Sequence, residues 1–387
     1  MNDEVHAGAG GRRRERLSVL GFTELRPEEL RDPLLAADAR ATVVELDPDR
    51  GVPSRCYRQA VDGVRALRGD RYDAVLVYNG AGPMGLVAAG LARAFGVPLV
   101  VRANGDLLRQ HRERAAAFRR ERVWTRAVAY AAYAFATWLT YRLAAGVVPV
   151  ATSLEPVLAR QSGLPPERVR AVPGPLRPGR TPRASDGGDG ETLSVLSVTN
   201  LGYEGKYRGA RAVLTALAPV LRAREEVELV VAGDGRYLED LCRDRDRLFE
   251  GGVRERVRLP GFVDDVAACY AAADVFCYAS DIDGYPNVVL EAQAAGLPVV
   301  ATPTYGVTEQ VTDGETGVLV PATDRAAMRE AVERLLADPD ERERLGRNGA
   351  ERVARENDPA VVGERLVAAV AALVGASLTE GEAEGPS

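Results

Sequence analysis

Short apolar runs alternate with longer amphipathic stretches along most of the chain. The short runs are rich in valine and leucine, which is typical of buried parallel strands, and the longer stretches have apolar residues at helical spacing. This alternation predicts an α/β fold with parallel sheets. The predicted strands cover residues 17–21, 42–46, 74–78, 98–102, 149–152, 192–198, 227–232, 257–259, 275–278, 298–301 and 317–320. Predicted helices include those starting near 153, 209, 236, 266 and 287.

A composition change divides the chain into two α/β halves. Residues 177–191 consist largely of Pro, Gly, Arg, Ser and Asp, as expected of a linker. The sequence therefore predicts two doubly wound Rossmann-like domains, with ligands bound in a cleft between them at the carboxyl ends of the strands. The predicted segments are a disordered tail (1–16), an N-terminal domain (17–176), the linker (177–191), a C-terminal domain (192–358), a final helix able to return to the first domain (359–374) and a second disordered tail (375–387).

Composition excludes several classes of protein. The net charge is −6, so there is no general basic field to attract nucleic acid. The four cysteines form no CxxC pair and there are two histidines, so no zinc site is predicted. The polar start of the chain has no signal-peptide pattern, which favours a cytoplasmic protein. Lys206 is the only lysine among 50 basic residues, which makes it a candidate functional cation.

One loop imitates a dinucleotide-binding fingerprint. Gly80, Gly82 and Gly85 fit the pattern GxGxxG after a predicted strand, and Asp106 follows about twenty residues later. The strand is not the first of its domain, Pro83 lacks an N–H group that could bind phosphate, and Asp106 lies beyond the next strand. We favour an ordinary strand-to-helix turn and keep an NAD-dependent dehydrogenase as the alternative.

The segment from Ser280 to Thr302 carries the most specific chemical signal. Asp281 and Asp283 follow a strand, and Glu291 comes eight residues after Asp283. The turn at residues 284–287 is expected to end at a helix N-terminus, where backbone N–H groups bind phosphate. Acids beside an anion site suit a ligand with both phosphate and hydroxyl groups, such as a nucleotide sugar. Taken alone, the pair would be better explained as a loop acid that caps a helix and an exposed helical glutamate.

The same segment resembles the signature of retaining glycosyltransferases of family four. The sequence DGYPNVVLEA followed by AAGLPVVAT fits the family pattern of two acids separated by seven residues. TNLGYEGKYRG, VELVVAGDG, VRLPGFVDDV and TDGETGVLV follow in the family's order. The resemblance runs from about residue 72 to residue 374 and is far more specific in the C-terminal half. It implies a GT-B fold, retention of anomeric configuration, and a nucleotide-sugar substrate without a bound metal or other cofactor.

The resemblance also implies roles for individual residues. Glu291 would hold the donor's ribose, and Asp283 would orient the transferred sugar. Lys206 and Arg208 would bind the diphosphate and neutralise the charge that develops on it as it leaves. The backbone around Gly284, Tyr285, Pro286 and Asn287 would bind donor oxygens.

Three features depart from the family pattern. Asp283 replaces the commoner glutamate and is one methylene shorter. The first predicted strand is not followed by paired glycines. Where the family often has a histidine in its N-terminal domain, this chain has Asn104 and Asp106, which become the acceptor-side candidates, with His111 a more distant third.

An unusual stretch bears on the acceptor. Seven arginines crowd residues 109–126, and residues 127–141 carry aromatics and no charge. Fifteen residues are too few to cross a bilayer, but arginines beside aromatics suit an anionic membrane surface. A buried helix with a solvated start explains the pattern equally well. If residues 109–141 do contact a membrane, the protein would be peripheral on its inner face.

We therefore expect a glycosyltransferase that moves a sugar from a nucleotide-sugar donor to a hydroxyl of a saccharide or lipid-linked acceptor. The alternatives are the NAD-dependent dehydrogenase and a non-catalytic GT-B partner subunit.

Overall fold

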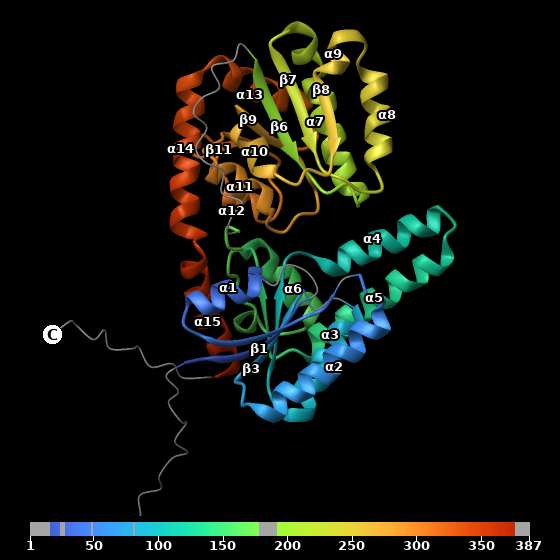
Figure 1. Cartoon of the computed structure of the whole chain (residues 1–387), viewed down its shortest axis with the longest axis vertical. Coiled ribbons are helices and arrows are strands. Elements are labelled where there is room, and N and C mark those ends of the chain that lie inside the picture. Colours follow the sequence, from blue (N-terminus) through green and yellow to red (C-terminus); the bar gives the residue numbers. More distant parts are fainter. Residues whose placement is uncertain (1–15, 24–27, 48, 80–81, 178–191, 376–387) are drawn as a thin grey trace, which may run out of the picture.

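The protein is described from a computed structural model that covers residues 16–23, 28–47, 49–79, 82–177 and 192–375. Two parallel sheets, each covered by helices on both faces, lie one beyond the other along the long axis (Figure 1). Apart from Arg16 and Gly375, the predicted terminal tails lie outside the described residues, as does the predicted linker apart from Arg177.

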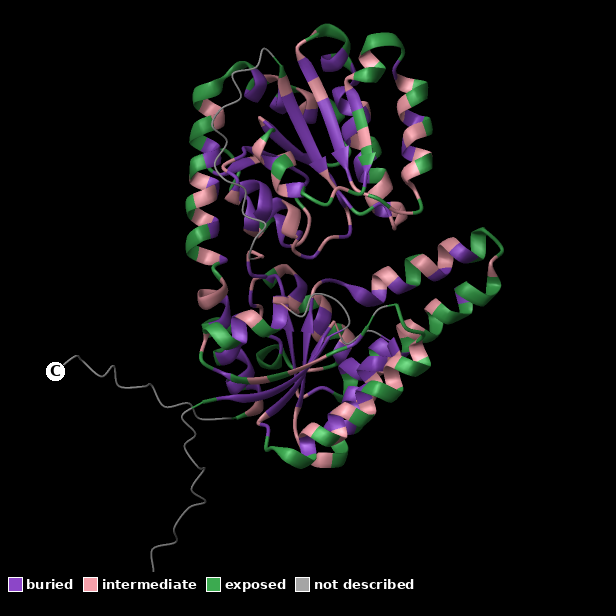
Figure 2. Ribbon diagram, viewed as in Figure 1, coloured by how far each residue is buried: buried purple, intermediate pink, exposed green. Residues whose placement is uncertain are grey.

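The first sheet belongs to the N-terminal half and has the strand order β2-β1-β3-β4-β5. Strands β1, β3, β4 and β5 are buried, as the apolar pattern predicts, whereas the edge strand β2 is partly exposed (Figure 2). Its elements are β1 (Ser18–Thr23), α1 (Glu28–Ala36), β2 (Arg40–Glu45), α2 (Val52–Gly69), β3 (Ala74–Tyr78), α3 (Gly82–Phe95), β4 (Leu99–Ala103), α4 (Leu107–Arg120), α5 (Trp124–Leu143), β5 (Gly146–Pro149), η1 (Thr152–Leu154), α6 (Glu155–Ser162) and η2 (Pro166–Arg168).

The second sheet belongs to the C-terminal half and has the order β11-β10-β9-β6-β7-β8. Because the order reverses beside β6, the loops after β6 and β9 diverge and leave a crevice at the sheet's carboxyl edge. Its elements are β6 (Leu193–Val198), α7 (Glu204–Ala223), β7 (Val227–Ala232), α8 (Leu238–Leu248), α9 (Gly251–Glu255), β8 (Val257–Gly261), α10 (Val266–Ala271), β9 (Val275–Tyr278), α11 (Asn287–Ala294), β10 (Val299–Ala301), α12 (Val307–Gln310), β11 (Gly317–Leu319), α13 (Arg325–Ala337), α14 (Pro339–Glu356) and α15 (Pro359–Val374).

The last two helices begin at matching sequence signals. Asp338 and Asp358 accept hydrogen bonds from backbone N–H groups of the first turns of α14 and α15. Each is followed by a proline, whose fixed backbone angle and missing N–H suit the first helical position. These caps set the point where the chain leaves the second domain.

Helix α15 packs on the first domain although it follows the second in sequence. Its apolar side chains, including Val362 and Leu366, share a buried cluster with Leu30 and Leu34 of α1. A Cβ atom added at Gly363 would lie 1.9 Å from the Pro33 carbonyl oxygen, so the glycine permits the close crossing of α1 and α15. Helices α14 and α15 thereby connect the two halves along one side of the molecule (Figure 1).

Three details differ from the sequence prediction. The fifth strand is Gly146–Pro149 rather than 149–152, because the chain turns into η1 at Thr152. Helix α7 begins at Glu204, five residues before the predicted start, so Lys206 and Arg208 lie in its first turns. The side chain of Arg177, assigned to the linker, is only 12% exposed and pairs with Glu29.

Candidate active site

A cavity of about 240 Å³ lies between the carboxyl edges of the two sheets. The first domain contributes Tyr78, Arg102 and Asn104 from the ends of β3 and β4. The second contributes Lys206 and Asp283 together with the loop that leads into α11. The cavity therefore joins residues from both halves at the position that doubly wound sheets use for ligands.

A polar cluster at this cavity consists of Lys206 and Asp283, which line it, and the buried Tyr278. The Lys206 ammonium donates to the Tyr278 hydroxyl at 2.6 Å and contacts the Asp283 carboxylate. Burial alone would raise the pKa of Asp283, but the charge of Lys206 and hydrogen bonds from Lys206, Tyr278 and Ser280 outweigh it and hold that pKa below its ordinary value. Asp283 is thus an anion and its nearest cation is Lys206. Tyr278, buried beside this anion, has a pKa well above its ordinary range.

The loop before α11 packs directly against the first domain. A Cβ atom at Gly284 would lie 2.4 Å from the Asn104 carbonyl oxygen, so only glycine fits there. The Tyr285 hydroxyl accepts a hydrogen bond from Asn357 at 3.0 Å, and burial raises the pKa of Tyr285 to about 12. Helix α11 starts at Asn287, which lines the cavity together with Val288, so the predicted anion site at this N-terminus would lie at the cavity's edge.

A second network, centred on Glu29, was not anticipated from the sequence. The Glu29 carboxylate accepts hydrogen bonds from Arg177 and Asn287, each at 2.8 Å, and contacts the Tyr78 hydroxyl. It therefore links α1 to the first residue of α11 across the cleft. No residue pattern distinguishes Glu29 from the neighbouring Glu28, because its role depends on segments more than a hundred residues away.

Arg102 is the other residue that the sequence reasoning missed. It ends β4 with a guanidinium that donates to the carbonyl oxygens of Pro149, Val172 and Pro173. Burial lowers its pKa to about 10, partly offset by nearby Tyr78 and Glu29. The signal available in the sequence was a charged residue within the valine-rich run of β4.

Glu291 does not line the cavity. It is 1% exposed on the inner side of α11, where the Tyr270 hydroxyl donates to its carboxylate at 3.0 Å and Arg177 lies 3.6 Å away. A ligand hydroxyl would reach Glu291 only after Arg177 moved aside.

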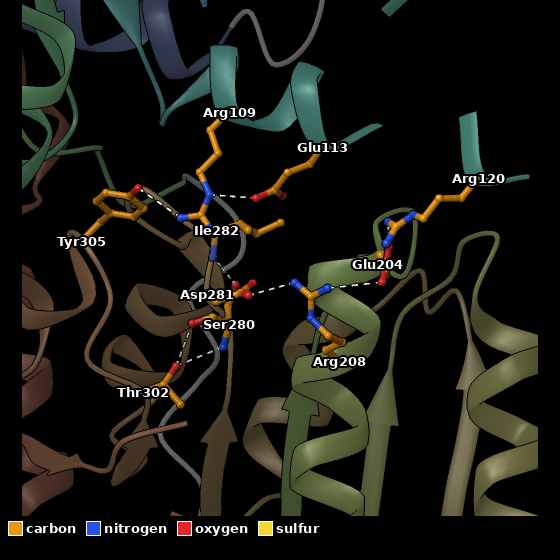
Figure 3. A network of polar contacts seen from close by, with 10 residues as sticks. All are labelled: Arg109, Glu113, Arg120, Glu204, Arg208, Ser280, Asp281, Ile282, Thr302 and Tyr305. Atoms are coloured by element: carbon orange, nitrogen blue, oxygen red, sulfur yellow. Dashed lines mark hydrogen bonds and ion pairs between the residues drawn. The ribbon is translucent and has the colours of Figure 1, made fainter. Parts of the chain in front are cut away.

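Arg208 also points away from Lys206. Residues two apart on a helix face different sides, and Arg208 pairs with Asp281 at 2.9 Å and with Glu204 at 3.3 Å. Glu204 in turn pairs with Arg120 of α4, so the chain of charges crosses between the domains (Figure 3). Arg208 lines a separate cavity of about 470 Å³ between α4 and α7.

The acceptor-side candidates separate in the same way. Asn104 lines the central cavity and contacts the Tyr78 hydroxyl. Asp106 instead caps α4, accepting from the Arg109 N–H and from Gln161, each at 2.9 Å. His111 lines another cavity in the first domain. The structure thus assembles Lys206, Asp283, Asn104 and the 284–287 loop, and leaves Arg208, Glu291 and Asp106 outside the central cavity.

In the loop that resembles a dinucleotide-binding fingerprint, the described glycine Gly82 packs against helix α5. The Gly82 N–H donates to Thr137 at 2.9 Å, and a Cβ atom at Gly82 would lie 2.4 Å from the Tyr133 ring. Gly80 lies outside the described residues. No comparison with known proteins supports the dehydrogenase alternative.

The fold is that of the GT-B glycosyltransferases. Anabaena HepE in complex with UDP and glucose superimposes with a TM-score of 0.69 at 17% identity, over 92% of this chain and all of HepE. Sucrose-phosphate synthase from Thermosynechococcus elongatus gives 0.68 at 19% identity, over 94% of this chain and all of that one. At such identities the likeness defines the architecture alone.

Sequence comparison relates the C-terminal domain to a known family of enzymes. Residues 192–338 match the profile described as "Glycosyl transferases group 1". A phosphatidyl-myo-inositol mannosyltransferase from Mycobacterium leprae is 38% identical over 169 residues, and an alpha-D-kanosaminyltransferase from Streptomyces kanamyceticus is 31% identical over 175. These alignments span 43–44% of each chain. The C-terminal domain of this chain is thus similar to the group 1 glycosyltransferases.

Proposed function

We propose that the protein is a retaining glycosyltransferase that moves a sugar from a nucleotide-diphosphate sugar to an acceptor hydroxyl. The observation that carries the proposal is the grouping of Lys206, Asp283 and the N-terminus of α11 in one interdomain cavity. These residues lie within the segment that matches the family.

Each group would have a distinct task. The N–H groups at the start of α11 bind phosphate oxygens, and Lys206 neutralises the charge that grows on the departing diphosphate. Asp283, kept anionic, accepts hydrogen bonds from sugar hydroxyls and so orients the sugar. In this arrangement the diphosphate competes with Asp283 for the Lys206 ammonium, and no bound metal is required for charge neutralisation.

Arg208 and Glu291 would take part only after local rearrangement. Arg208 would have to exchange Asp281 for a phosphate, and Arg177 would have to leave Glu291 before a ribose could reach it. Donor binding is therefore expected to shift both arginines.

The exposed face of α5 supports peripheral membrane binding. Trp124, Val128 and Phe135 are each more than 60% exposed, and Arg112 and Arg119 line the same shallow cavity of about 580 Å³. No described residue lining it is acidic. Exposed aromatics beside arginines suit the interface of an anionic bilayer, which would place a lipid-linked acceptor within reach. No helix in the described part of the chain is long and apolar enough to span a membrane.

A thermal-shift panel tests the proposal. UDP, GDP, ADP, their common sugars and NAD would be added to the wild type and to Lys206→Met, with and without EDTA. A ligand at about 100 times its Kd stabilises the folded state by about 2.7 kcal/mol. One nucleoside diphosphate should raise the thermal midpoint of the wild type and should raise that of the Lys206→Met variant by less. The shift of the wild type should be the same with and without EDTA. Stabilisation by NAD alone, or by nothing in the panel, would contradict a working transferase.

A further inference from the structure

A second cavity, of about 380 Å³, opens beside the candidate active site in the first domain. It lies at the carboxyl ends of β1 and β3 and is covered by α4 and α5. Tyr78, Gln110 and Tyr203 line both this cavity and the central one. A molecule bound here would therefore lie next to the Lys206–Asp283 cluster, on the side opposite α11.

The imidazole of His111 is an unexplained feature of this cavity. It is 7% exposed in the second turn of α4, and neither ring nitrogen has a hydrogen-bond partner within the described residues. The ring lies tilted beside the rings of Tyr130 and Tyr133 of α5, with centroids 6.2 and 5.8 Å away. Leaving a buried polar group without a partner destabilises the folded state, so a purely structural role would favour an apolar residue.

The charges around the ring restrict what it can bind. Burial, and to a smaller extent Arg114, lowers the pKa of His111 to about 4, so the imidazole is neutral at physiological pH. Arg114 also lines the cavity. Its guanidinium carbon Cζ lies 3.8 Å from the centroid of the Tyr203 ring. No described residue of the lining is a carboxylate. An ammonium group entering here would meet a cation and no counter-charge.

We propose that this cavity binds the acceptor and that His111 selects an uncharged polyol ring, such as a cyclitol or a pyranose, over an aminated one. This inference rests on the proposed glycosyltransferase activity. A neutral imidazole has one N–H donor and one acceptor nitrogen that point apart, so one of them can bond a hydroxyl of the ring while the other bonds a second hydroxyl of the acceptor or water. Tyr130 and Tyr133 supply the apolar surface for the ring's C–H face. An anionic substituent on the ring is tolerated because Arg114 is nearby.

The histidine count allows a direct binding test. The chain has two histidines, so in a His6→Ala variant of the full-length protein the imidazole resonances come from His111 alone. Nitrogen-15 NMR of that ring would be recorded with myo-inositol, methyl α-D-mannopyranoside or 2-deoxystreptamine, in the presence of the nucleoside diphosphate that stabilises the protein. At least one of the uncharged polyols should shift the His111 nitrogens, and 2-deoxystreptamine should not. No shift with either polyol, or an equal shift with the aminated ring, would overturn the proposal.

Kinetics supply a second, independent readout. His111→Leu should raise the acceptor KM at least tenfold and change the KM for the nucleotide sugar much less. His111→Asn or His111→Gln, which restore polar atoms near Nδ1 or Nε2, should recover part of the loss. Thr140→Val is the matched control, because Thr140 is a buried polar residue of the same domain that does not line the cavity. An unchanged acceptor KM in His111→Leu would overturn the inference.

The two levels of proposal fail differently. If no nucleoside diphosphate stabilises the protein and no nucleotide sugar is hydrolysed, the transferase proposal itself fails, and the acceptor proposal fails with it. If the donor is bound and hydrolysed but His111 responds to neither polyol, only the acceptor proposal fails.

Discussion

The ammonium of Lys206 lies against the carboxylate of Asp283 although 77 residues separate the two in the chain. Lys206 comes from the first turn of α7 and Asp283 from the loop after β9, and these two elements meet beside the central strand of the second sheet. Each group is the other's nearest counter-charge, and Tyr278 bonds to both. In the proposed reaction, a phosphate group would replace Asp283 as the partner of Lys206, and a sugar would replace Lys206 as the partner of Asp283.

Lys206 and Arg208 should contribute unequally to the rate of sugar transfer, because only Lys206 lines the central cavity. Lys206→Met is expected to lower kcat by about 10²–10³, the range for loss of one charge-stabilising group in an enzyme site. Arg208→Met should reduce kcat by a factor at most one tenth as large. Steady-state kinetics at saturating donor measure both. Arg243→Ala, which removes an exposed pair with Asp240, is the control. Equal losses in the two methionine variants would contradict the arrangement described here.

Gly284→Ala should impair the closed cleft rather than the stability of either domain. The added Cβ would lie 2.4 Å from the Asn104 carbonyl oxygen, and that backbone atom belongs to the opposite domain. The domains should separate slightly to accommodate it, so the donor KM rises and kcat falls about tenfold or more. Gly90→Ala is the control, since a Cβ there meets nothing within 4 Å. A thermal midpoint lowered by many degrees with unchanged kinetics would show that the contact is only structural.

His111 should make the folded state less stable in mild acid. Its folded pKa of about 4 lies below the ordinary value of 6.5, so the unfolded chain binds more protons between these pH values. The stability linked to His111 is therefore complete above about pH 6.5 and is lost as the pH falls towards 4, by up to about 3 kcal/mol. Arg114 on α4 and Tyr130 and Tyr133 on α5 face the ring.

Denaturant unfolding between pH 4 and 7 measures this dependence. Carboxylates titrate in the same pH range, so the relevant quantity is the difference in the free energy of unfolding between the wild type and His111→Leu. As the pH falls, the wild type should lose more of this free energy than the leucine variant does. A constant difference across the range would show that His111 is not buried as described.

The α5 surface should control membrane binding independently of the arginines that connect the domains. Trp124→Ser with Phe135→Ser should reduce sedimentation with vesicles containing phosphatidylglycerol by about tenfold or more, because two exposed aromatics leave the interface. Arg112→Glu with Arg119→Glu should act in the same direction and be sensitive to salt.

Arg120 is unsuitable for that test because it pairs with Glu204 of the second domain. Tyr57→Ser is the matched control, an exposed aromatic on α2 that lies outside the α5 cavity. If the wild type ignores anionic vesicles, or if Tyr57→Ser weakens binding as strongly as the α5 variants do, the α5 surface is not a membrane site.

The sequence by itself determined the course of the chain through both domains. The strands at 74–78, 227–232 and 275–278 fall at the predicted residues because a buried parallel strand needs an uninterrupted apolar run, which is a local property. The start of α11 at Asn287 was also readable, since the turn at 284–287 and the helix that follows are adjacent in sequence. The motif there located Asp283, and the scarcity of lysine drew attention to Lys206.

The tertiary structure alone decided which side chains face the cleft. Lys206 and Arg208 are equivalent in the sequence, but the early start of α7 sends them to different sides of a helix. Glu291 fits the family motif, yet it points inward to Tyr270, and Asp106 caps a helix. Glu29 and His111 gain their positions from α11, Arg177 and α5, which the chain brings to them only on folding. Burial and partnership are properties of packing between distant segments, and no local pattern of residues encodes them.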